Sequence, residues 1–319
     1  MVEVGIVGAT GLVGSGMIRI LQERSFPASS IRAFASNRHG DRTLTVGNIT
    51  YPVEIINPAS LGQGTILLGA TSSDIARTWI PDCVAHGAIV IDNSSAYRLR
   101  EDVPLVVPEV NPHTIRMHGG LIANPNCSTI QLVVALAPLC AVSPVRWLSV
   151  STYQAVSGAG GHALRTLENE WVHGSPDGDV VFTGRILTEI GDPADNGYCM
   201  EETKLILETH KILEMDFPVY SSCARVPVRT GHTEAVTVMF TEPVSVETAV
   251  EILTGAPGLR LFERGVTPVT VEGTDYVAVS RIRNHPDDMH VLQFWVTADN
   301  LRKGAALNAV QIAEILAQE

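Results

Sequence analysis

The chain opens with VEVGIVGATGLVG, residues Val2–Gly14, in which a β-rich stretch runs directly into a glycine turn. Apolar residues at helical spacing follow, between Met17 and Leu21. Strand, glycine turn and helix, in that order, are typical of a dinucleotide-binding βαβ unit, where the turn lets the backbone approach a pyrophosphate at the helix N-terminus. A tight turn without a ligand is the alternative. We expect the cofactor to contact Gly8, Thr10, Gly11, Leu12 and Val13.

Short apolar segments alternate with helical stretches through the rest of the first half. Thr65–Leu68 and Ala88–Ile91 are typical of strands, and Asp74–His86 of a helix between them. Small polar residues follow each expected strand, where the ligand crevice of a doubly wound sheet lies. We therefore expect an α/β fold that begins with a doubly wound, Rossmann-like domain. Its ligand edge would carry Ser72 and Asn93, with Arg98 just beyond to face an anionic substrate.

The residues after the second expected strand, Ile31–Ala35, bear on the choice of cofactor. An acidic residue at this point binds the ribose 2′-hydroxyl of NAD, but this chain has Ser36 and Arg38 there instead. A hydroxyl and a guanidinium can hold a 2′-phosphate. We therefore expect NADP, with a solvated loop charge as the alternative reading of Arg38.

The second half changes to longer β-rich segments, which are Val145–Tyr153, Ala235–Phe240 and Leu292–Thr297. We expect a mixed α+β catalytic and dimerisation domain there. The final stretch, Asn308–Leu316, is apolar at helical spacing and is expected to pack back onto the first domain. The predicted boundaries are therefore 1–127 plus 300–319 for the nucleotide-binding domain and 128–299 for the catalytic domain.

Composition limits the classes of function. The 319 residues are 45% hydrophobic and 18% charged, which suits about two domains with buried cores. A net charge of −12 disfavours nucleic acid and anionic membranes as partners. No apolar run reaches the ~20 residues that span a bilayer, and no export signal begins the chain, so we expect a cytoplasmic protein. The five cysteines lack disulfide or zinc spacing, so we expect reduced thiols and no metal.

One of these cysteines lies at a position that can activate a thiol. In LIANPNCSTIQL, residues 121–132, Cys127 stands where a strand-like approach gives way to an apolar helix. Unpaired N–H groups and the helix dipole would stabilise its thiolate there, although a small buried hydrophobe is the alternative. A thiol nucleophile needs a proton acceptor close in space, and ten histidines compete. We favour His232, which lies between a probable strand and turn and the next strand.

Several sequence blocks, in order along nearly the whole chain, resemble the aspartate-β-semialdehyde dehydrogenase family. They are the glycine turn at 8–14, DNSS at 92–95 with Arg98, VVPEVN at 106–111, NPNCST at 124–129, YQAVSGAG at 153–160, Arg225 seven residues before His232, and DNLRKGAA at 299–306. Members of this family reduce β-aspartyl phosphate to aspartate β-semialdehyde with NADPH and release phosphate, in the biosynthesis of lysine, methionine and threonine. The resemblance implies this reaction here, together with a homodimer or a homotetramer.

The resemblance also assigns roles to matching residues. Cys127 would attack the acyl phosphate and form a thioester, Gln154 would orient the acyl group, and His232 would handle the proton. A thioester is a sensible intermediate because it stays activated and tethered beside the nicotinamide. Ser157, Gly158 and Asn300 would contact the cofactor, and the small residues of the 157–160 loop would let the nicotinamide ring come close, with a plain flexible loop as the alternative.

By the same resemblance, Arg98, Asn93 and Lys204 would hold the phosphate, Arg225 the substrate carboxylate and Glu201 the substrate ammonium group. Glu201 and Lys204 stand at i and i+3, so both can address one ligand. Without the resemblance, an ordinary surface salt bridge is an equally good reading of this pair.

The segment between Gly160 and Glu201 is shorter than expected for the family, and the family's Asn-x-Leu-Pro element, which helps dimer packing, appears only as Arg185–Thr188. This leaves open a specialised paralogue that reduces a related acyl phosphate. An N-acyl-γ-glutamyl-phosphate reductase is a further alternative, but an acylated amine offers no positive charge to Glu201. A non-catalytic NADP-binding regulatory paralogue is the last alternative, and it would have no need of the Cys127 nucleophile.

Overall fold

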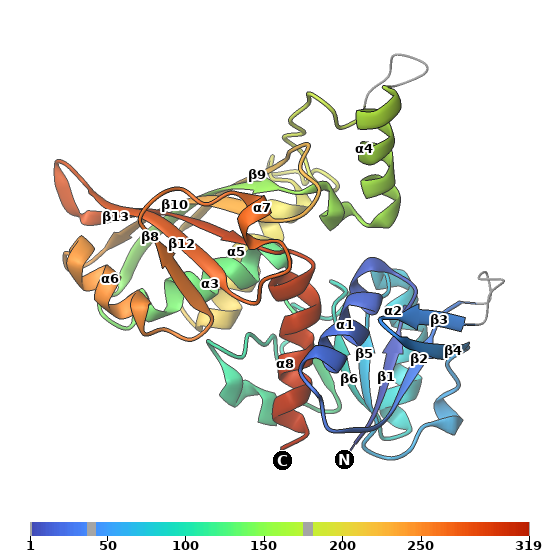
Figure 1. Ribbon diagram of the computed structural model, residues 1–319. Helices are drawn as coiled ribbons and strands as arrows, with labels where there is room; N and C mark the ends of the chain where they lie inside the picture. The colour runs from blue at the N-terminus through green and yellow to red at the C-terminus, as the bar shows by residue number, and fades with distance from the viewer. Residues whose placement is uncertain (1, 37–42, 175–180, 319) are drawn as a thin grey trace. The chain divides into compact units, whose positions relative to one another are not determined.

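The computed structural model describes residues 2–36, 43–174 and 181–318 and divides into two compact units (Figure 1). Unit 1 comprises Met1–Asn126 and Ala305–Glu319, and unit 2 comprises Cys127–Gly304. These limits differ from the expected 1–127 plus 300–319 and 128–299. Cys127 falls in unit 2 because it is the first residue of a helix that packs on the second sheet, and residues 300–304 stay with the strand that precedes them.

Unit 1 is built around a seven-stranded sheet with the order β3-β4-β2-β1-β5-β6-β7. Its strands are β1 Val2–Val7, β2 Ala28–Phe34, β3 Thr43–Val46, β4 Ile49–Glu54, β5 Ile66–Gly69, β6 Ile89–Asp92 and β7 Leu121–Ala123. Every neighbouring pair is parallel except the β3–β4 hairpin. Because β2 and β5 flank β1 on opposite sides, the strand order switches direction there, which is where an α/β sheet binds ligands. The expected α/β class with a Rossmann-like first domain is confirmed.

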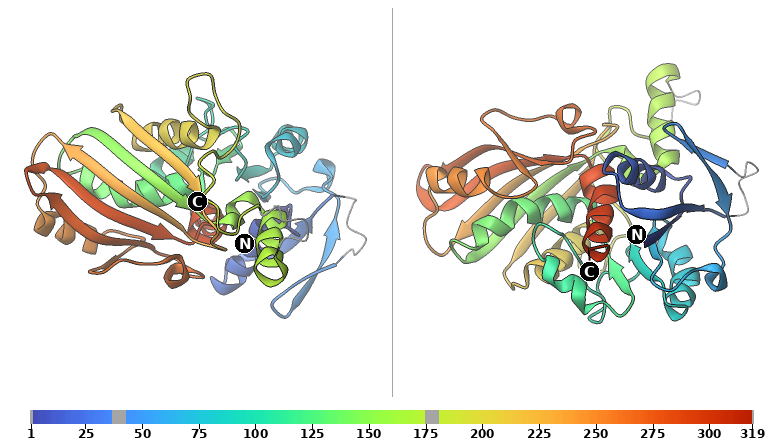
Figure 2. Two further views of the ribbon diagram at one scale, coloured as in Figure 1. Left: turned by 90° about the horizontal axis from the view of Figure 1, so that it is seen from above. Right: turned by 60° about the horizontal axis from the view of Figure 1, so that its bottom comes forward.

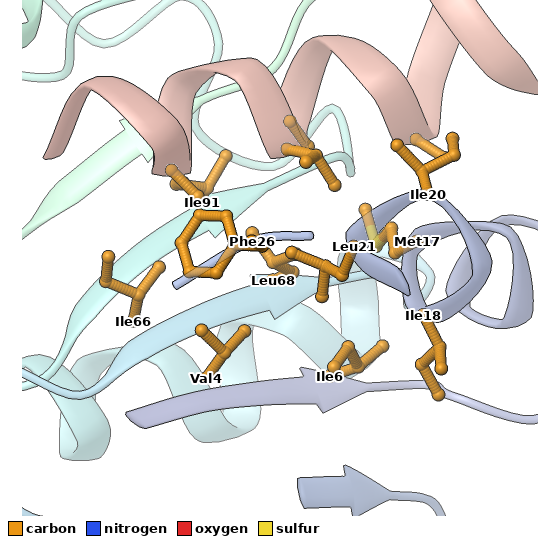
Figure 3. Packing of buried hydrophobic residues seen from close by; sticks show 14 of the residues in the cluster. Val4, Ile6, Met17, Ile18, Ile20, Leu21, Phe26, Ile66, Leu68 and Ile91 are labelled. Carbon is orange, nitrogen blue, oxygen red and sulfur yellow. The ribbon is translucent and has the colours of Figure 1, made fainter. Parts of the chain in front are cut away.

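The helices of unit 1 are α1 Leu12–Glu23, α2 Ser73–Ala85 and α8 Leu307–Leu316, with 3₁₀ turns η1 Pro58–Ser60 and η2 Pro112–Met117. Apolar side chains of β1, β5 and α1 interlock in its core (Figure 3). Helix α8, from the C-terminal end of the chain, lies beside α1 (Figure 2) and buries Leu307, Val310 and Ile312 in the same core. The last residues of the chain therefore complete the unit that the first residues begin.

Unit 2 contains a six-stranded mixed sheet with the order β11-β12-β13-β10-β8-β9. Its strands are β8 Val145–Gln154, β9 Val219–Arg225, β10 His232–Phe240, β11 Leu259–Phe262, β12 Val277–His285 and β13 Asp288–Ala298. The β8–β9 and β11–β12 pairs are parallel, and the others are antiparallel. Along β10 the even-numbered residues are buried and the odd-numbered ones are partly exposed, so only one face of this strand is fully covered.

The helical elements of unit 2 are α3 Cys127–Cys140, α4 Gly161–His173, α5 Met200–Leu213, α6 Val246–Thr254, α7 Pro268–Val271 and the 3₁₀ turn η3 Val156–Ala159, while the π-helical turn η4 Arg302–Ala306 spans the boundary to unit 1. Helix α3 is apolar on all sides and packs against α5, α6 and the sheet strands, as a buried central helix does. Within the described residues, no helix is both long enough and apolar enough to cross a membrane.

Candidate active site

Cys127 is the first residue of α3, and its side chain is only partly buried. Its Sγ atom lies 3.2 Å from Nε2 of His232, although the two residues are 105 positions apart in the sequence. The positive end of the α3 dipole favours the thiolate form of this residue. The structure thus brings together the nucleophile and the histidine that the sequence singled out.

His232 is the first residue of β10 and is completely buried. The backbone N–H of Ala155 donates a hydrogen bond of 3.0 Å to its Nδ1 atom. A neutral imidazole that accepts at Nδ1 carries its hydrogen on Nε2, so the N–H points at Sγ. Burial and, second, the positive charge of Arg225 hold the pKa of His232 well below its ordinary value. The ring therefore meets the sulfur as a hydrogen-bond donor, whereas the sequence led us to expect a proton acceptor.

Arg225 ends β9 and is buried beside the same pair. Its Nη1 donates to the Ala155 carbonyl oxygen at 2.9 Å and to Oε1 of Gln154 at 3.4 Å. Its backbone exchanges two hydrogen bonds, of 2.8 and 2.9 Å, with Leu187 in the segment that departs from the family pattern. Burial lowers the pKa of Arg225, and the nearby Cys127 and Glu201 partly offset this. A buried cation with further N–H groups to offer suits a carboxylate ligand.

Glu201 and Lys204 lie in the first turns of α5 and contact each other. Lys204 Nζ donates to Glu201 Oε2 at 3.3 Å, as expected for positions i and i+3. Glu201 is only 8% exposed, which is unusual for one half of an ordinary surface salt bridge. Its proximity to Arg225 places a buried anion and a buried cation in the same region of unit 2.

The 157–160 loop lies against these groups. A Cβ atom added to Gly158 would lie 2.9 Å from Nη1 of Arg225 and 3.3 Å from the His232 ring, so only glycine fits without displacing them. Ser157 and Asn300 hydrogen-bond to each other, and Asn300 Oδ1 accepts the Gly231 N–H at 2.8 Å. These contacts fix the turn that leads into His232.

A cavity of about 410 Å³ lies in unit 1 at the switch point of the sheet. It is lined by Val7, Gly8, Thr10, Gly11, Phe34, Ala35, Ser36, Ile55, Ile56, Ala70, Thr71, Ser72, Ile75, Thr78 and Trp79. Gly8 has a φ of +88°, and a Cβ atom on Gly14 would lie 2.3 Å from the Gly8 carbonyl oxygen, so the turn is open only because these residues are glycines. The residues fit the adenosine and pyrophosphate of a dinucleotide.

Most of the residues expected to bind the cofactor at this end line the cavity, but not all do. Leu12 and Val13 begin α1 and are not among the lining residues. Arg38 lies outside the described residues. The indole of Trp79 and the aliphatic side chains at 55, 56 and 75 also line the cavity but were not expected. Their local sequence does not show which side chains of α2, or of the segment after β4, face the glycine turn.

Arg98 and Asn93 lie in unit 1, at the carboxyl ends of β6 and β7. Arg98 donates through Nε to the carbonyl oxygen of Asn124 at 2.9 Å and through Nη2 to that of Asn93 at 2.7 Å. The Asn93 side chain donates to the Gly69 carbonyl oxygen and accepts from Asn124, which in turn accepts from Asn308. In this arrangement Arg98 holds the backbone of Asn124, just before Cys127, and Asn93 holds the side chain of Asn124.

Three further residues around the thiol and the imidazole were not predicted. Gln131 donates through Nε2 to the His232 carbonyl oxygen at 3.4 Å. Glu234 is wholly buried two residues after His232. A Cβ atom on Gly304 would lie 3.0 Å from the Cys127 Cβ, so this glycine leaves room for the Cys127 side chain. The described residues contain no group of three or more His, Cys, Asp or Glu that could hold a metal ion.

The same chain matches known proteins over nearly its whole length. Residues 3–118 match the model of the semialdehyde dehydrogenase NAD binding domain, and residues 136–303 match that of the semialdehyde dehydrogenase dimerisation domain. The chain is 40% identical to an aspartate-semialdehyde dehydrogenase from Prochlorococcus marinus over 324 residues, covering 98% of this chain and 94% of the relative.

Solved structures give the same result. Aspartate semialdehyde dehydrogenase II of Vibrio cholerae, complexed with ASA, is 37% identical with a TM-score of 0.94, covering 100% of this chain and 99% of that one. The Candida albicans enzyme, solved with NADP, is 26% identical with a TM-score of 0.77, covering 99% of both chains. This chain belongs to the aspartate-semialdehyde dehydrogenase family.

Proposed function

We propose that this protein catalyses the NADPH-dependent reductive dephosphorylation of β-aspartyl phosphate to aspartate β-semialdehyde through a thioester on Cys127. The observation that carries the proposal is the 3.2 Å contact between the Cys127 sulfur at the start of α3 and the His232 ring, with Arg225 buried beside it. Family membership supplies the reaction class. The residues of unit 2 supply a nucleophile, a hydrogen-bond donor and a cation.

In the first half of the reaction the Cys127 thiolate attacks the acyl carbon. The S–C bond forms, the C–O bond to phosphate breaks, and phosphate leaves with the electron pair of that bond and takes up a proton from solvent. The Nε2–H of His232 first stabilises the thiolate and then the oxyanion that develops on the acyl oxygen. Gln154, held by Thr152 and Arg225, orients the acyl group.

In the second half, NADPH supplies the hydride that reduces the thioester. Gly8, Thr10, Gly11 and Ser72 would hold the cofactor at the switch point of unit 1, with Ser36 and Arg38 at its 2′-phosphate. Ser157, Gly158 and Asn300 would keep the space beside His232 open to the nicotinamide. The thiolate leaves as the aldehyde forms. The His232 N–H then stabilises the negative charge on the sulfur atom again.

The charges in unit 2 favour a free amino acid as substrate. Arg225 would bind the α-carboxylate and Glu201 the ammonium group, and these two buried groups of opposite sign complement a zwitterion. Lys204, with Arg98 and Asn93, would hold the phosphate. An N-acylated substrate would have no positive charge to offer Glu201, whose own ion pair with Lys204 would remain, so it would lose this charge-assisted contact.

The decisive experiment is the reverse reaction. NADP reduction by aspartate β-semialdehyde should require phosphate or arsenate, and mass spectrometry after quenching should find the acyl adduct on Cys127. N-acetyl-glutamate γ-semialdehyde serves as the matched alternative substrate. A clear preference for it, or NADP binding with no turnover of either aldehyde, would overturn the proposal in favour of the reductase or the non-catalytic reading.

The lowered pKa of His232 predicts the pH dependence of the reaction. Because protonation occurs only well below pH ~6.5, kcat/KM should show no ionisation of this ring between about pH 6 and 8. His232→Gln, which keeps an N–H donor, should retain more activity than His232→Ala, expected to lose on the order of 10²-fold or more. A change in kcat/KM with a midpoint near pH 6.5 that is absent from the glutamine variant would show that His232 works as an acid or base instead.

We propose that the dimer interface is the face of the second sheet that carries the partly exposed, odd-numbered residues of β10. It carries Tyr153 stacked on Trp295, with ring centroids 6.0 Å apart, and the Arg281 guanidinium over Trp295. Tyr220, on the same face, is 56% exposed. The matching family model of the dimerisation domain includes all strands of this sheet. We therefore propose that a second copy of the chain packs against this face in a homodimer, or in a homotetramer built of such dimers.

A charge at the centre of this face should separate the subunits. Ala235 lies on β10 between Ser151 and Trp295 of the flanking strands. Ala235→Arg should reduce the mass measured by light scattering to that of a monomer, because two buried like charges would meet across a two-fold axis. Val250→Arg on α6, outside the face, is the matched control. An unchanged mass for the Ala235 variant would rule out this interface.

The chemistry also suits the cytoplasm, which we propose as the site of the reaction. None of the five cysteines forms a disulfide, and Cys127 must stay reduced to act as a nucleophile.

A further inference from the structure

A wholly buried carboxyl group lies on the face of β10 that carries His232. Glu234 is 0% exposed, and alternation along the strand puts it on the same face as His232. Its direct neighbours across the sheet are Thr152 on β8 and Val296 on β13. Helix α3, packed against this sheet, contains no Asp, Glu, Lys, Arg or His. The titratable groups of this strand face and helix are thus the His232 ring and the cysteine thiols of α3.

The atoms around Glu234 form an unmatched set of acceptors. Both of its carboxyl oxygens and Oε1 of Gln131 are buried and have no hydrogen-bond donor among the described residues. The Gln131 side chain lies next to the Glu234 carboxyl. Buried acceptors that lack a donor are costly unless one of them carries a hydrogen. Burial raises the pKa of Glu234 well above its ordinary value and outweighs the lowering by the Gln131 side chain, which favours the protonated form of the carboxyl group.

We propose that Glu234 is a positioning residue, which as a neutral acid donates its hydrogen to Oε1 of Gln131, whose amide holds the His232 carbonyl. Gln131 lies one turn after Cys127 on α3, so this chain of hydrogen bonds ties the strand that bears the imidazole to the helix that bears the thiol. It thereby sets the 3.2 Å distance from sulfur to Nε2. The inference rests on the proposed function, because Glu234 acts only through this pair.

The neutral state of Glu234 also protects the hydrogen-bond pattern of the ring. A negative charge two residues from His232 would favour the imidazolium form, whose Nδ1–H would face the N–H of Ala155. Burial, and second the positive charge of Arg225, act in the opposite direction and lower the pKa of the ring. Because Glu234 is neutral, it adds no negative charge that would raise the pKa of the ring again.

Substitution of Glu234 tests the proposal through the reactivity of the thiol. Glu234→Leu removes the donor and keeps most of the volume, so the rate of Cys127 alkylation by iodoacetamide at neutral pH, followed by intact mass, should fall about tenfold. The kcat of aspartate semialdehyde oxidation should fall by a similar factor, with KM within about twofold. Glu234→Gln can still donate to Oε1 of Gln131, so it should restore both rates to within about threefold of the wild type.

Val236→Ala is the matched control, since Val236 is buried on the same face of β10 but does not continue the chain to Gln131. It should lower the melting temperature without changing the rate of Cys127 alkylation at neutral pH. A leucine variant with wild-type alkylation and kcat would overturn the proposal. So would a glutamine variant as impaired as the leucine variant, because this would show that the ionised carboxylate is needed.

The pH dependence of stability gives a readout that needs no substrate. Between its ordinary and its raised pKa, Glu234 keeps a proton in the folded chain that the unfolded chain has lost, so wild-type stability falls as pH rises. The glutamine side chain of Glu234→Gln does not titrate, so the variant has no such loss of stability. The melting temperature of the variant minus that of the wild type should therefore increase from about pH 5 to about pH 8. A gap that does not change with pH would contradict a neutral buried acid. Because alkylation and melting do not depend on turnover, they separate a failure of this inference from a failure of the proposed reaction.

Discussion

Replacing Cys127 by serine should reduce kcat on the order of 10⁴-fold or more while leaving NADP binding intact. A hydroxyl ionises far less readily than a thiol, and neither the N-terminus of α3 nor the His232 N–H can make up this difference. Turnover should be measured in the phosphate-dependent reverse direction, and NADPH binding by the fluorescence of the reduced cofactor. The cavity at the Gly8 turn lies wholly in unit 1, so its affinity should not change.

Cys140 provides the control for this substitution, because it lies at the opposite end of the same helix. Burial raises the pKa of Cys140 to about 12, so its thiol is not a nucleophile at neutral pH. Cys140→Ser should change the melting temperature but leave kcat within about twofold. If Cys127→Ser keeps more than a few per cent of the activity, or if both variants lose it equally, the thioester mechanism is wrong.

Replacing Arg225 by leucine should raise the KM for aspartate semialdehyde by about 10²-fold or more, the cost of removing one partner of a buried charge-assisted pair. Its Nη1 donates hydrogen bonds to the Ala155 carbonyl oxygen and to Oε1 of Gln154, but the described residues offer no acceptor to its Nε and Nη2. Those two N–H groups have the fork geometry that a carboxylate matches. Arg225→Lys should recover little of the loss, because an ammonium group cannot serve the Ala155 carbonyl and the fork together.

An aldehyde without an α-carboxylate distinguishes this role from a general disturbance of the site. Propanal should be a poor substrate for the wild type, and its kcat/KM should be nearly the same with Arg225→Leu, since the lost contact has no partner in that substrate. An equal loss with both aldehydes would show that Arg225 acts through Cys127 and His232 rather than on the substrate carboxylate.

Local sequence predicted the elements whose signals are contained in a few neighbouring residues. The strand and glycine turn at 2–14 are such a case, because tolerance of the φ of +88° at Gly8 and the absence of side chains are properties of single residues. The β3–β4 hairpin at 43–54 and the strand β11 were not predicted, since segments of four to six residues carry little local signal and are stabilised by their pairing in the sheets. The order of strands in the second sheet depends on long-range pairing in the same way.

Within the site, residue types could be predicted but hydrogen-bond directions could not. Nothing in the sequence near His232 shows that the N–H of Ala155, 77 positions earlier, occupies its Nδ1, and this contact decides whether the ring donates or accepts. Glu234 could have been found. It has the same parity along the strand as Val236, Val238 and Phe240, so alternation already places it on the apolar face.

The interleaving of the two units has a consequence for synthesis on the ribosome. Unit 2 is one continuous stretch, whereas unit 1 needs α8, whose Leu307 and Val310 belong to the core begun by β1 and α1. A growing polypeptide therefore has a glycine turn and parallel strands with an incomplete interior until α8 has been synthesised. Unit 2 is free to fold first, and the core of unit 1 is completed only after all of unit 2 has been synthesised and α8 has left the ribosome.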